Sequence, residues 1–193
     1  MSLKKKTMTA AAALGAVALL AVGATSASAA TIPLHIVNGT SSSPAAIYTG
    51  GTGSHTVPVS GEDFIYDPAW AGSLFSDAGI YVVFGPELDI SDSSVYTDAN
   101  AFAAYEGGQF WVHNGADTSE SDQTELSTAG DFSGVNLIVE STFQDGNDDT
   151  FTCTTGPDDT TSGRVDCFIY TLSAHGSWDR GNDNAIPVYF GTE

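Results

Sequence analysis

Short stretches in which apolar and polar residues alternate recur along the chain. In residues 32–37, IPLHIV, every second side chain is a large aliphatic one, and residues 134–143, GVNLIVESTF, largely repeat the pattern. Successive side chains of a β-strand point to opposite faces of a sheet. This period of two therefore predicts strands that bury one face and expose the other.

A third segment is apolar at nearly every position. Residues 79–85, GIYVVFG, place β-branched and aromatic residues between two glycines, which is typical of a central strand. Turn-forming Gly, Ser, Asp and Pro residues separate the segments, and only residues 98–106, DANAFAAYE, have a weak helical pattern. Many short strands with frequent turns predict an all-β sandwich or barrel, of which we favour the sandwich. The predicted strands cover residues 32–37, 55–59, 79–85, 109–113, 134–143, 164–172 and 186–190.

The N-terminal segment differs from the rest of the chain. Three lysines precede an apolar run of Ala, Leu and Val, and the run ends in the small residues ASAA. This order is that of a secretory signal peptide, and a retained membrane anchor is the alternative. We predict a signal peptide over residues 1–30, then one domain over residues 31–193 that is secreted, extracellular and not inserted in the membrane. This domain is either released or associated with the cell surface.

The chain is strongly acidic. It has 24 Asp and Glu residues against 5 Lys and Arg residues, a formal net charge of -19, and all its lysines lie in the predicted signal peptide. Lys and Arg side chains neutralise the phosphates of nucleic acids and anionic lipids. The composition therefore argues against nucleic acid and anionic membranes as partners, and it leaves cationic partners and calcium open.

The chain has two cysteines, Cys153 and Cys167. In a secreted protein, two cysteines most simply form one disulfide. The segment between them is rich in turn-forming residues, so the bridge would join two neighbouring strands near a loop. A metal-binding or catalytic cysteine is disfavoured, because no second thiol or histidine lies at ligand spacing.

The segment before the last predicted strand has the residue types of a hydrolytic site. It contains His175, Ser177, Asp179, Arg180 and Asp183. A nucleophilic serine is usually presented by a shaped turn such as G-x-S-x-G, which the sequence lacks. We therefore predict a turn between the last two strands, with Arg180 in a surface ion pair, and assign no catalytic residue.

Two further patterns suggest metal sites and are weak. Residues 145–149, DGNDD, begin like a calcium loop, but Thr150 stands where an EF-hand needs glycine and Gly156 where it needs glutamate. We predict a hairpin loop there and no metal or cofactor. The four histidines are scattered over separate segments: His35, His55, His113 and His175.

A pair of carboxyl groups that hydrolyses glycosides is a further possibility. The sequence does not test it, because 24 acidic residues allow many pairs.

The region near residues 86–130 is an expanded loop region between two predicted strands. Its aromatic segment AFAAYEGGQFWVH is either a strand over the core or a recognition patch, since long loops on a rigid scaffold often carry function. The candidate residues for binding a ligand or partner are Tyr105, Phe110 and Trp111.

Four segments, VSGEDFIYDPAW, DAGIYVVFGP, GDFSGVNLIVE and VDCFIYTLSAHGSWDRGNDNAIPVYF, resemble successive strands of the neocarzinostatin-like immunoglobulin-type domain of secreted actinobacterial proteins. The resemblance covers roughly residues 55–190. It implies an immunoglobulin-like Greek-key sandwich of about seven strands, in which Cys153 and Cys167 match the C-terminal disulfide of the family.

The sequence departs from the antibiotic-carrying members of that family at their chromophore cleft. Those members have a second disulfide and a tryptophan beside the strand that matches residues 79–85. Gly85 and Glu87 stand at these positions, so the chromophore-binding pattern is not carried over.

Three functions follow as hypotheses. The first, which we favour, is a secreted, non-catalytic immunoglobulin-like module that binds an extracellular protein, a surface polymer or a small hydrophobic ligand. The second is a carrier that sequesters a small hydrophobic molecule. An apolar cleft beside residues 79–85 would favour this hypothesis. The third is an extracellular glycoside hydrolase, which needs two carboxyl groups roughly 5 to 10 Å apart.

Overall fold

The computed structural model describes residues 32–66, 79–92, 99–114, 120–174 and 180–193. Strands dominate these residues, and they contain two 3-10 turns, η3 (Ala99–Ala101) and η4 (Arg180–Asn182), but no α-helix. The strands are β1 (Leu34–Val37), β2 (Ser41–Ser43), β3 (Ile47–Tyr48), β4 (Ser54–Glu62), β5 (Gly79–Pro86), β6 (Gln109–His113), β7 (Gln123–Glu125), β8 (Phe132–Glu140), β9 (Thr142–Gln144), β10 (Thr150–Thr152), β11 (Cys167–Ser173) and β12 (Asn184–Tyr189).

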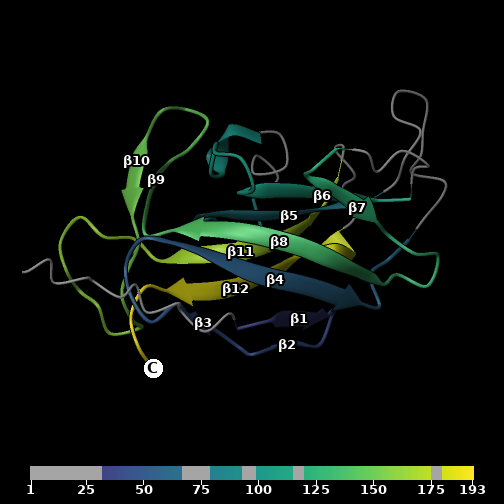
Figure 1. The fold of residues 1–193 in the computed structure, drawn as a ribbon, viewed down its shortest axis with the longest axis horizontal. Helices are drawn as coiled ribbons and strands as arrows, with labels where there is room; N and C mark the ends of the chain where they lie inside the picture. The colour runs from purple at the N-terminus through teal and green to yellow at the C-terminus, as the bar shows by residue number, and fades with distance from the viewer. Residues whose placement is uncertain (1–31, 67–78, 93–98, 115–119, 175–179) are drawn as a thin grey trace, which may run out of the picture.

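Two sheets pack face to face, as Figure 1 shows. One has the strand order β2-β1-β4-β8, and the other has the order β3-β12-β11-β5-β6-β7. The antiparallel run β12-β11-β5-β6 matches the G-F-C-C′ order of immunoglobulin domains, and β4 and β8 pair like strands B and E. The chain crosses between the sheets after β2, after β3, after β4, before β8 and before β11, so the predicted all-β, immunoglobulin-like Greek-key sandwich is confirmed.

The core lies between the two sheets and follows the alternation of the sequence. In β8, Val135, Leu137 and Val139 are at most 1% exposed, while the residues between them are more exposed. Phe84 of β5 is fully buried, and its ring centroid lies 5.0 Å from that of Phe143. Burying a side chain of this size contributes roughly 1.5–3 kcal/mol, so each of these positions stabilises the packing of the two sheets.

A smaller apolar cluster covers the opposite, outer face of the six-stranded sheet. Val83, Tyr170 and Leu172 point to this side and pack against Phe102. The Tyr170 hydroxyl donates to the carbonyl of Pro86 at 2.8 Å and accepts a hydrogen bond from the backbone N–H of Leu88 at 2.8 Å. The segment after β5 is therefore held against its own sheet.

The seven predicted strands correspond to the seven described strands that have four or more residues: β1, β4, β5, β6, β8, β11 and β12. The additional strands have two or three residues, and of these β2, β3, β7 and β10 were not predicted. The predicted strand over residues 134–143 is interrupted at Ser141, where β8 ends and β9 begins. The weak helical pattern of residues 98–106 yields only η3 among its described residues.

The predicted disulfide between Cys153 and Cys167 is confirmed, with a Cα–Cα distance of 5.6 Å. It joins the residue after β10 to the first residue of β11. Beside it, the backbone N–H of Thr154 donates to the carbonyl of Val165 at 2.9 Å. No helix among the described residues is long and apolar enough to span a membrane.

The connection between β11 and β12 is described only in its second half. His175, Ser177 and Asp179, which we predicted to lie in a turn, fall outside the described residues. Arg180 forms the expected ion pair with Asp183, at 3.0 Å. The described part of this connection consists of η4, and β12 begins at Asn184.

Candidate ligand-binding groove

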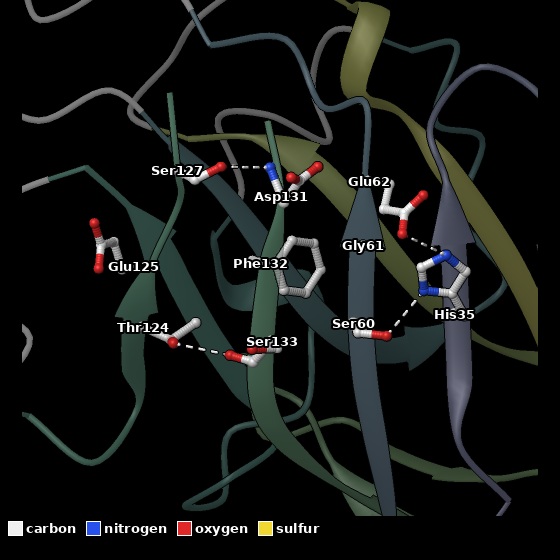
Figure 2. A pocket seen from close by; sticks show the side chains of 10 residues that line it. All are labelled: His35, Ser60, Gly61, Glu62, Thr124, Glu125, Ser127, Asp131, Phe132 and Ser133. Carbon is white, nitrogen blue, oxygen red and sulfur yellow. Dashed lines mark hydrogen bonds and ion pairs between the residues drawn. The ribbon is translucent and has the colours of Figure 1, made fainter. Parts of the chain in front are cut away.

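A polar hollow of about 590 Å³ lies on the outer face of the four-stranded sheet, where β1, β4 and β8 meet β7 of the other sheet. We call it the first groove. Figure 2 shows an imidazole, a hydroxyl and a carboxylate on one side and residues of β7 on the other. The groove is lined by His35, Ser60, Gly61, Glu62, Thr124, Glu125, Ser127, Asp131, Phe132 and Ser133.

Strand alternation places the polar residues of the first groove. In β1, His35 lies between Leu34 and Ile36, which are fully buried, and it therefore points outward. In β4, Ser60 and Glu62 point outward by the same argument. The two strands pair in parallel with His35 opposite Ser60, so these side chains become neighbours.

A glycine and an irregular register shape the floor of the first groove. A Cβ atom on Gly61 would lie 2.3 Å from the ring of Phe132, so only glycine fits above this packed side chain. The register between β4 and β8 shifts here, and Ser60 lies opposite a two-residue segment, Ser133 and Gly134. Gly134 has a φ of 86°, a conformation that favours glycine. Such bulges change the direction of side chains and often occur beside functional sites.

One side of the first groove carries an ordered polar array. The Ser60 Oγ atom lies 3.0 Å from His35 Nδ1, and the Glu62 Oε1 atom lies 3.6 Å from His35 Nε2. The His35 and Glu62 side chains are 39% and 58% exposed, so solvent and a ligand both reach them. A hydroxyl, an imidazole and a carboxylate in this order can bind a polar ligand, and they also resemble the order of a hydrolytic triad.

The other side is fixed by a turn. The Ser127 hydroxyl accepts the backbone N–H of Asp131 at 3.0 Å, and the backbone N–H of Ser127 donates to the carbonyl of Asp131 at 2.9 Å. The Thr124 hydroxyl donates to the carbonyl of Ser133 at 3.0 Å and so connects the edges of the two sheets. Three carboxylates line the groove with one imidazole, so it disfavours anionic ligands. Within the part of the chain that the structure describes, no group of three or more His, Cys, Asp and Glu residues could hold a metal ion.

A second hollow of about 480 Å³ lies at the other end of β8, beside the β9–β10 hairpin. We call it the second groove. The hydroxyl of Tyr105 donates to the carbonyl of Ile138 at 3.0 Å. Burial, and secondarily the charge of Glu140, raises the pKa of Tyr105 above its usual range, so the hydroxyl stays protonated. The second groove is lined by Ala104, Tyr105, Glu140, Thr142, Phe143, Gln144 and Thr150.

The structure separates the three residues predicted to bind a ligand or partner. Tyr105 lines the second groove. Phe110 is 8% exposed and belongs to the core between the sheets. Trp111 follows it in β6 and therefore points to the outer face, where its ring stacks on His113 with centroids 3.9 Å apart. Their role in binding stays a prediction.

The first groove was missed by reasoning from the sequence. His35 is a polar position in the predicted strand 32–37, so its outward direction could be inferred, whereas Ser60 lies one residue beyond the predicted strand 55–59, which continues to Glu62 in the structure. Their proximity depends on the parallel pairing of β1 with β4, for which the sequence offers no signal.

The loop at residues 145–149 has the structure of a hairpin connection, as predicted. It joins the antiparallel strands β9 and β10. The carboxylate of Asp145 accepts the backbone N–H groups of Asn147 and Asp149, each at 2.9 Å. This carboxylate is thus engaged in holding its own turn.

No protein-family model, curated protein or solved structure matches this chain. The resemblance to the neocarzinostatin-like domain therefore stays a prediction.

Proposed function

We propose that the protein is a secreted, non-catalytic immunoglobulin-like binding module that recognises its ligand through the first groove. One observation carries this proposal: polar side chains from both sheets converge on a hollow of about 590 Å³. Most of them are mounted on strands, which hold donors and acceptors at fixed spacing more precisely than loops do. Binding sites are commonly concave and carry a few polar groups that orient the ligand.

Secretion and family membership are parts of the same proposal. The basic, apolar and small-residue segments of residues 1–30 support a signal peptide. The disulfide supports an oxidising compartment. The G-F-C-C′ strand order supports a neocarzinostatin-like domain, in which this chain would have exchanged the carrier cleft for a polar groove.

The contacts of β5 favour a binding module over a carrier of a small hydrophobic molecule. A carrier of the kind considered above needs an apolar cleft beside this strand. Val83, which points outward from β5, is 2% exposed and belongs to a cluster with Phe102 and Leu172. The chain's own side chains thus occupy this part of the sheet face.

The proposal is tested by filling the first groove. Ser133 is exposed, so Ser133→Trp should place an indole in the groove without disturbing the core. The probe is the insoluble wall fraction of the producing cells, and binding is measured by co-sedimentation. We expect the variant to bind at least about tenfold more weakly, as for the loss of a central contact.

Ser162→Trp, at an exposed position of the loop before β11, is the matched control and should bind like the unmodified protein. Equal binding by all three proteins, or no binding by any of them, contradicts the proposal.

The array of Ser60, His35 and Glu62 favours a hydrolase as a second candidate function. The Ser60 hydroxyl would attack an ester carbonyl while its proton passes to His35, and Glu62 would stabilise the imidazolium. His35 would then give this proton to the departing alcohol as the ester C–O bond breaks, and water would hydrolyse the acyl-serine and restore the Ser60 hydroxyl. A fluorophosphonate probe should then label Ser60 in the unmodified protein and not in His35→Gln. If the probe labels Ser60 no more strongly than it labels the exposed Ser133, the hydrolase hypothesis is contradicted. A glycoside hydrolase would instead draw its carboxyl pair from the acids that line the groove.

A further inference from the structure

The two grooves lie at opposite ends of the same strand, on the same face of the molecule. Ser133, near the start of β8, lines the first groove, and Glu140, at its end, lines the second. At about 3.3 Å per residue, these positions are roughly 23 Å apart. Because the residues that alternate with them are buried in the core, Asn136 and Ile138 also point outward between the grooves.

β8 is the edge strand of its sheet, but several of the backbone groups on its unpaired side already form hydrogen bonds with other parts of the chain. The backbone N–H of Ile138 donates to the carbonyl of Gly107 at 2.7 Å, and the carbonyl of Ile138 accepts the Tyr105 hydroxyl. At the other end, the carbonyl of Ser133 accepts the Thr124 hydroxyl. An extended peptide that adds to a sheet needs these backbone groups free. A ligand along β8 must therefore bind to side chains.

The side chains of the second groove suit a sugar ring. A sugar has a face of C–H groups that packs on an aromatic ring, and hydroxyl groups that bind carboxylates, amides and hydroxyls. Tyr105 supplies a ring whose position is fixed by its hydrogen bond to Ile138, and Glu140 and Gln144 supply a carboxylate and an amide. The hydroxyls and imidazole of the first groove supply further partners for sugar hydroxyls.

Charge narrows the class of polysaccharide. Three carboxylates line the first groove and Glu140 lines the second, while no Lys or Arg side chain lines either groove. The whole chain carries a formal net charge of -19. Anionic polysaccharides are therefore repelled.

From these observations we infer that a linear, uncharged polysaccharide binds along β8 and engages both grooves. This inference rests on the proposed function and names its ligand. Two joined sites bind a chain that spans both more tightly than each binds a short fragment, by about 100-fold or more when the spacing fits. The inference thus predicts a dependence on ligand length.

The test uses neutral, linear β-linked oligomers of glucose, N-acetylglucosamine, mannose and xylose, each as a disaccharide and a hexasaccharide. Heparin is the polyanionic comparison and chitosan the polycationic one. Binding is measured by isothermal titration calorimetry on the secreted protein. We expect at least one neutral hexasaccharide to bind about 100-fold more tightly than its disaccharide, and heparin not to bind.

Two variants block one groove each. Ser133→Trp fills the first groove, and Gln144→Trp, at an exposed position, fills the second. Either variant should reduce the affinity for the hexasaccharide to that for the disaccharide, while Ser162→Trp should leave it unchanged. Thermal unfolding of each variant establishes that it is folded.

Any of the following results overturns the inference. No neutral hexasaccharide binds, or chitosan is the only oligomer that binds. Alternatively, the hexasaccharide binds no more tightly than the disaccharide, or one of the two groove-filling variants leaves its affinity unchanged. If the wall fraction still binds in a manner that Ser133→Trp abolishes, the proposed function stands and only the polysaccharide is wrong. If Ser133→Trp changes neither measurement, both are wrong.

Discussion

A single buried amide, Asn182, joins three segments that are far apart in the sequence. It is 0% exposed, and its Oδ1 atom accepts the backbone N–H of Ile65 at 2.7 Å and a hydrogen bond from Asn38 Nδ2 at 3.2 Å. Its Nδ2 atom donates to the carbonyl of Ile65 at 3.1 Å. Asn182 thus closes one end of the sandwich, and its hydrogen bonds serve structure.

We predict that Asn182→Ala destabilises the protein by about 2–3 kcal/mol, because it removes the partner of both backbone groups of Ile65. The free energy of unfolding in urea measures this loss. Asn136→Ala, at an exposed position of β8, should change stability by less than about 0.5 kcal/mol. An equal effect of the two substitutions would show that the buried hydrogen bonds of Asn182 do not contribute.

The neighbours Phe110 and Trp111 should respond differently to truncation, because they lie on opposite faces of β6. Phe110→Ala leaves a cavity between the sheets and should cost about 3–5 kcal/mol. Trp111 is only half-buried, so Trp111→Ala should cost clearly less and leave a cooperative transition. Urea unfolding of the two variants gives the comparison, and a larger loss for Trp111 would contradict the placement of the two rings.

The loop between Cys153 and Cys167 is organised by one carboxylate. Asp159 accepts hydrogen bonds from Thr161 and Thr155. It also forms an ion pair with Arg164, whose Nη1 atom lies 2.6 Å from Asp159 Oδ2. The Asp159 side chain is 8% exposed. The hydrogen bonds of Thr161 and Thr155, followed by that of Arg164, lower the pKa of this carboxyl well below its usual range.

This lowered pKa predicts how stability depends on acid. A group whose pKa is lower in the folded than in the unfolded state stabilises the protein above its unfolded value, and this contribution is lost as the pH falls. The unfolded value is about 3.9, so the loss should begin between about pH 5 and pH 4 and continue below. In Asp159→Asn, the urea midpoint should therefore fall less between pH 6 and pH 3 than in the unmodified protein. The exposed neighbour Asp158→Asn should keep the original pH dependence, and parallel curves for all three would contradict the role of Asp159.

The strands show what the sequence could and could not predict. A strand such as β8 has enough alternating positions to reveal its buried face. Strands of two or three residues, such as β3 and β7, have no such period and exist because a longer strand lies beside them. The first groove depends on one of these, β7, and on the pairing of β1 with β4. Its polar residues could be assigned to a surface, but their convergence is a property of the tertiary fold.

Negative charges greatly outnumber positive charges on the surface of this protein. The 24 acidic residues face only 5 basic ones, and three of the latter belong to the predicted signal peptide. Among the described residues, Arg164 and Arg180 each form an ion pair within their own loop. Most carboxylates therefore repel one another across the surface, which favours expanded states over the compact fold.

Added salt should stabilise this acidic protein. At pH 7, raising sodium chloride from 0.02 M to 1 M shortens the screening length to about 3 Å and should weaken this repulsion. We expect a gain of about 1 kcal/mol, which raises the melting temperature by about 2–4 °C for a domain of this size. Circular dichroism at a β-sheet wavelength measures the change.

A comparison at pH 4 separates charge screening from other effects of salt. Near this pH, about half of ordinary carboxyl groups are protonated, so less repulsion remains to be screened. The gain in melting temperature should therefore be clearly smaller than at pH 7. An equal gain at both pH values would indicate that salt acts by strengthening apolar burial, and a fall at pH 7 would show that attractive ion pairs outweigh the repulsion of the acidic surface.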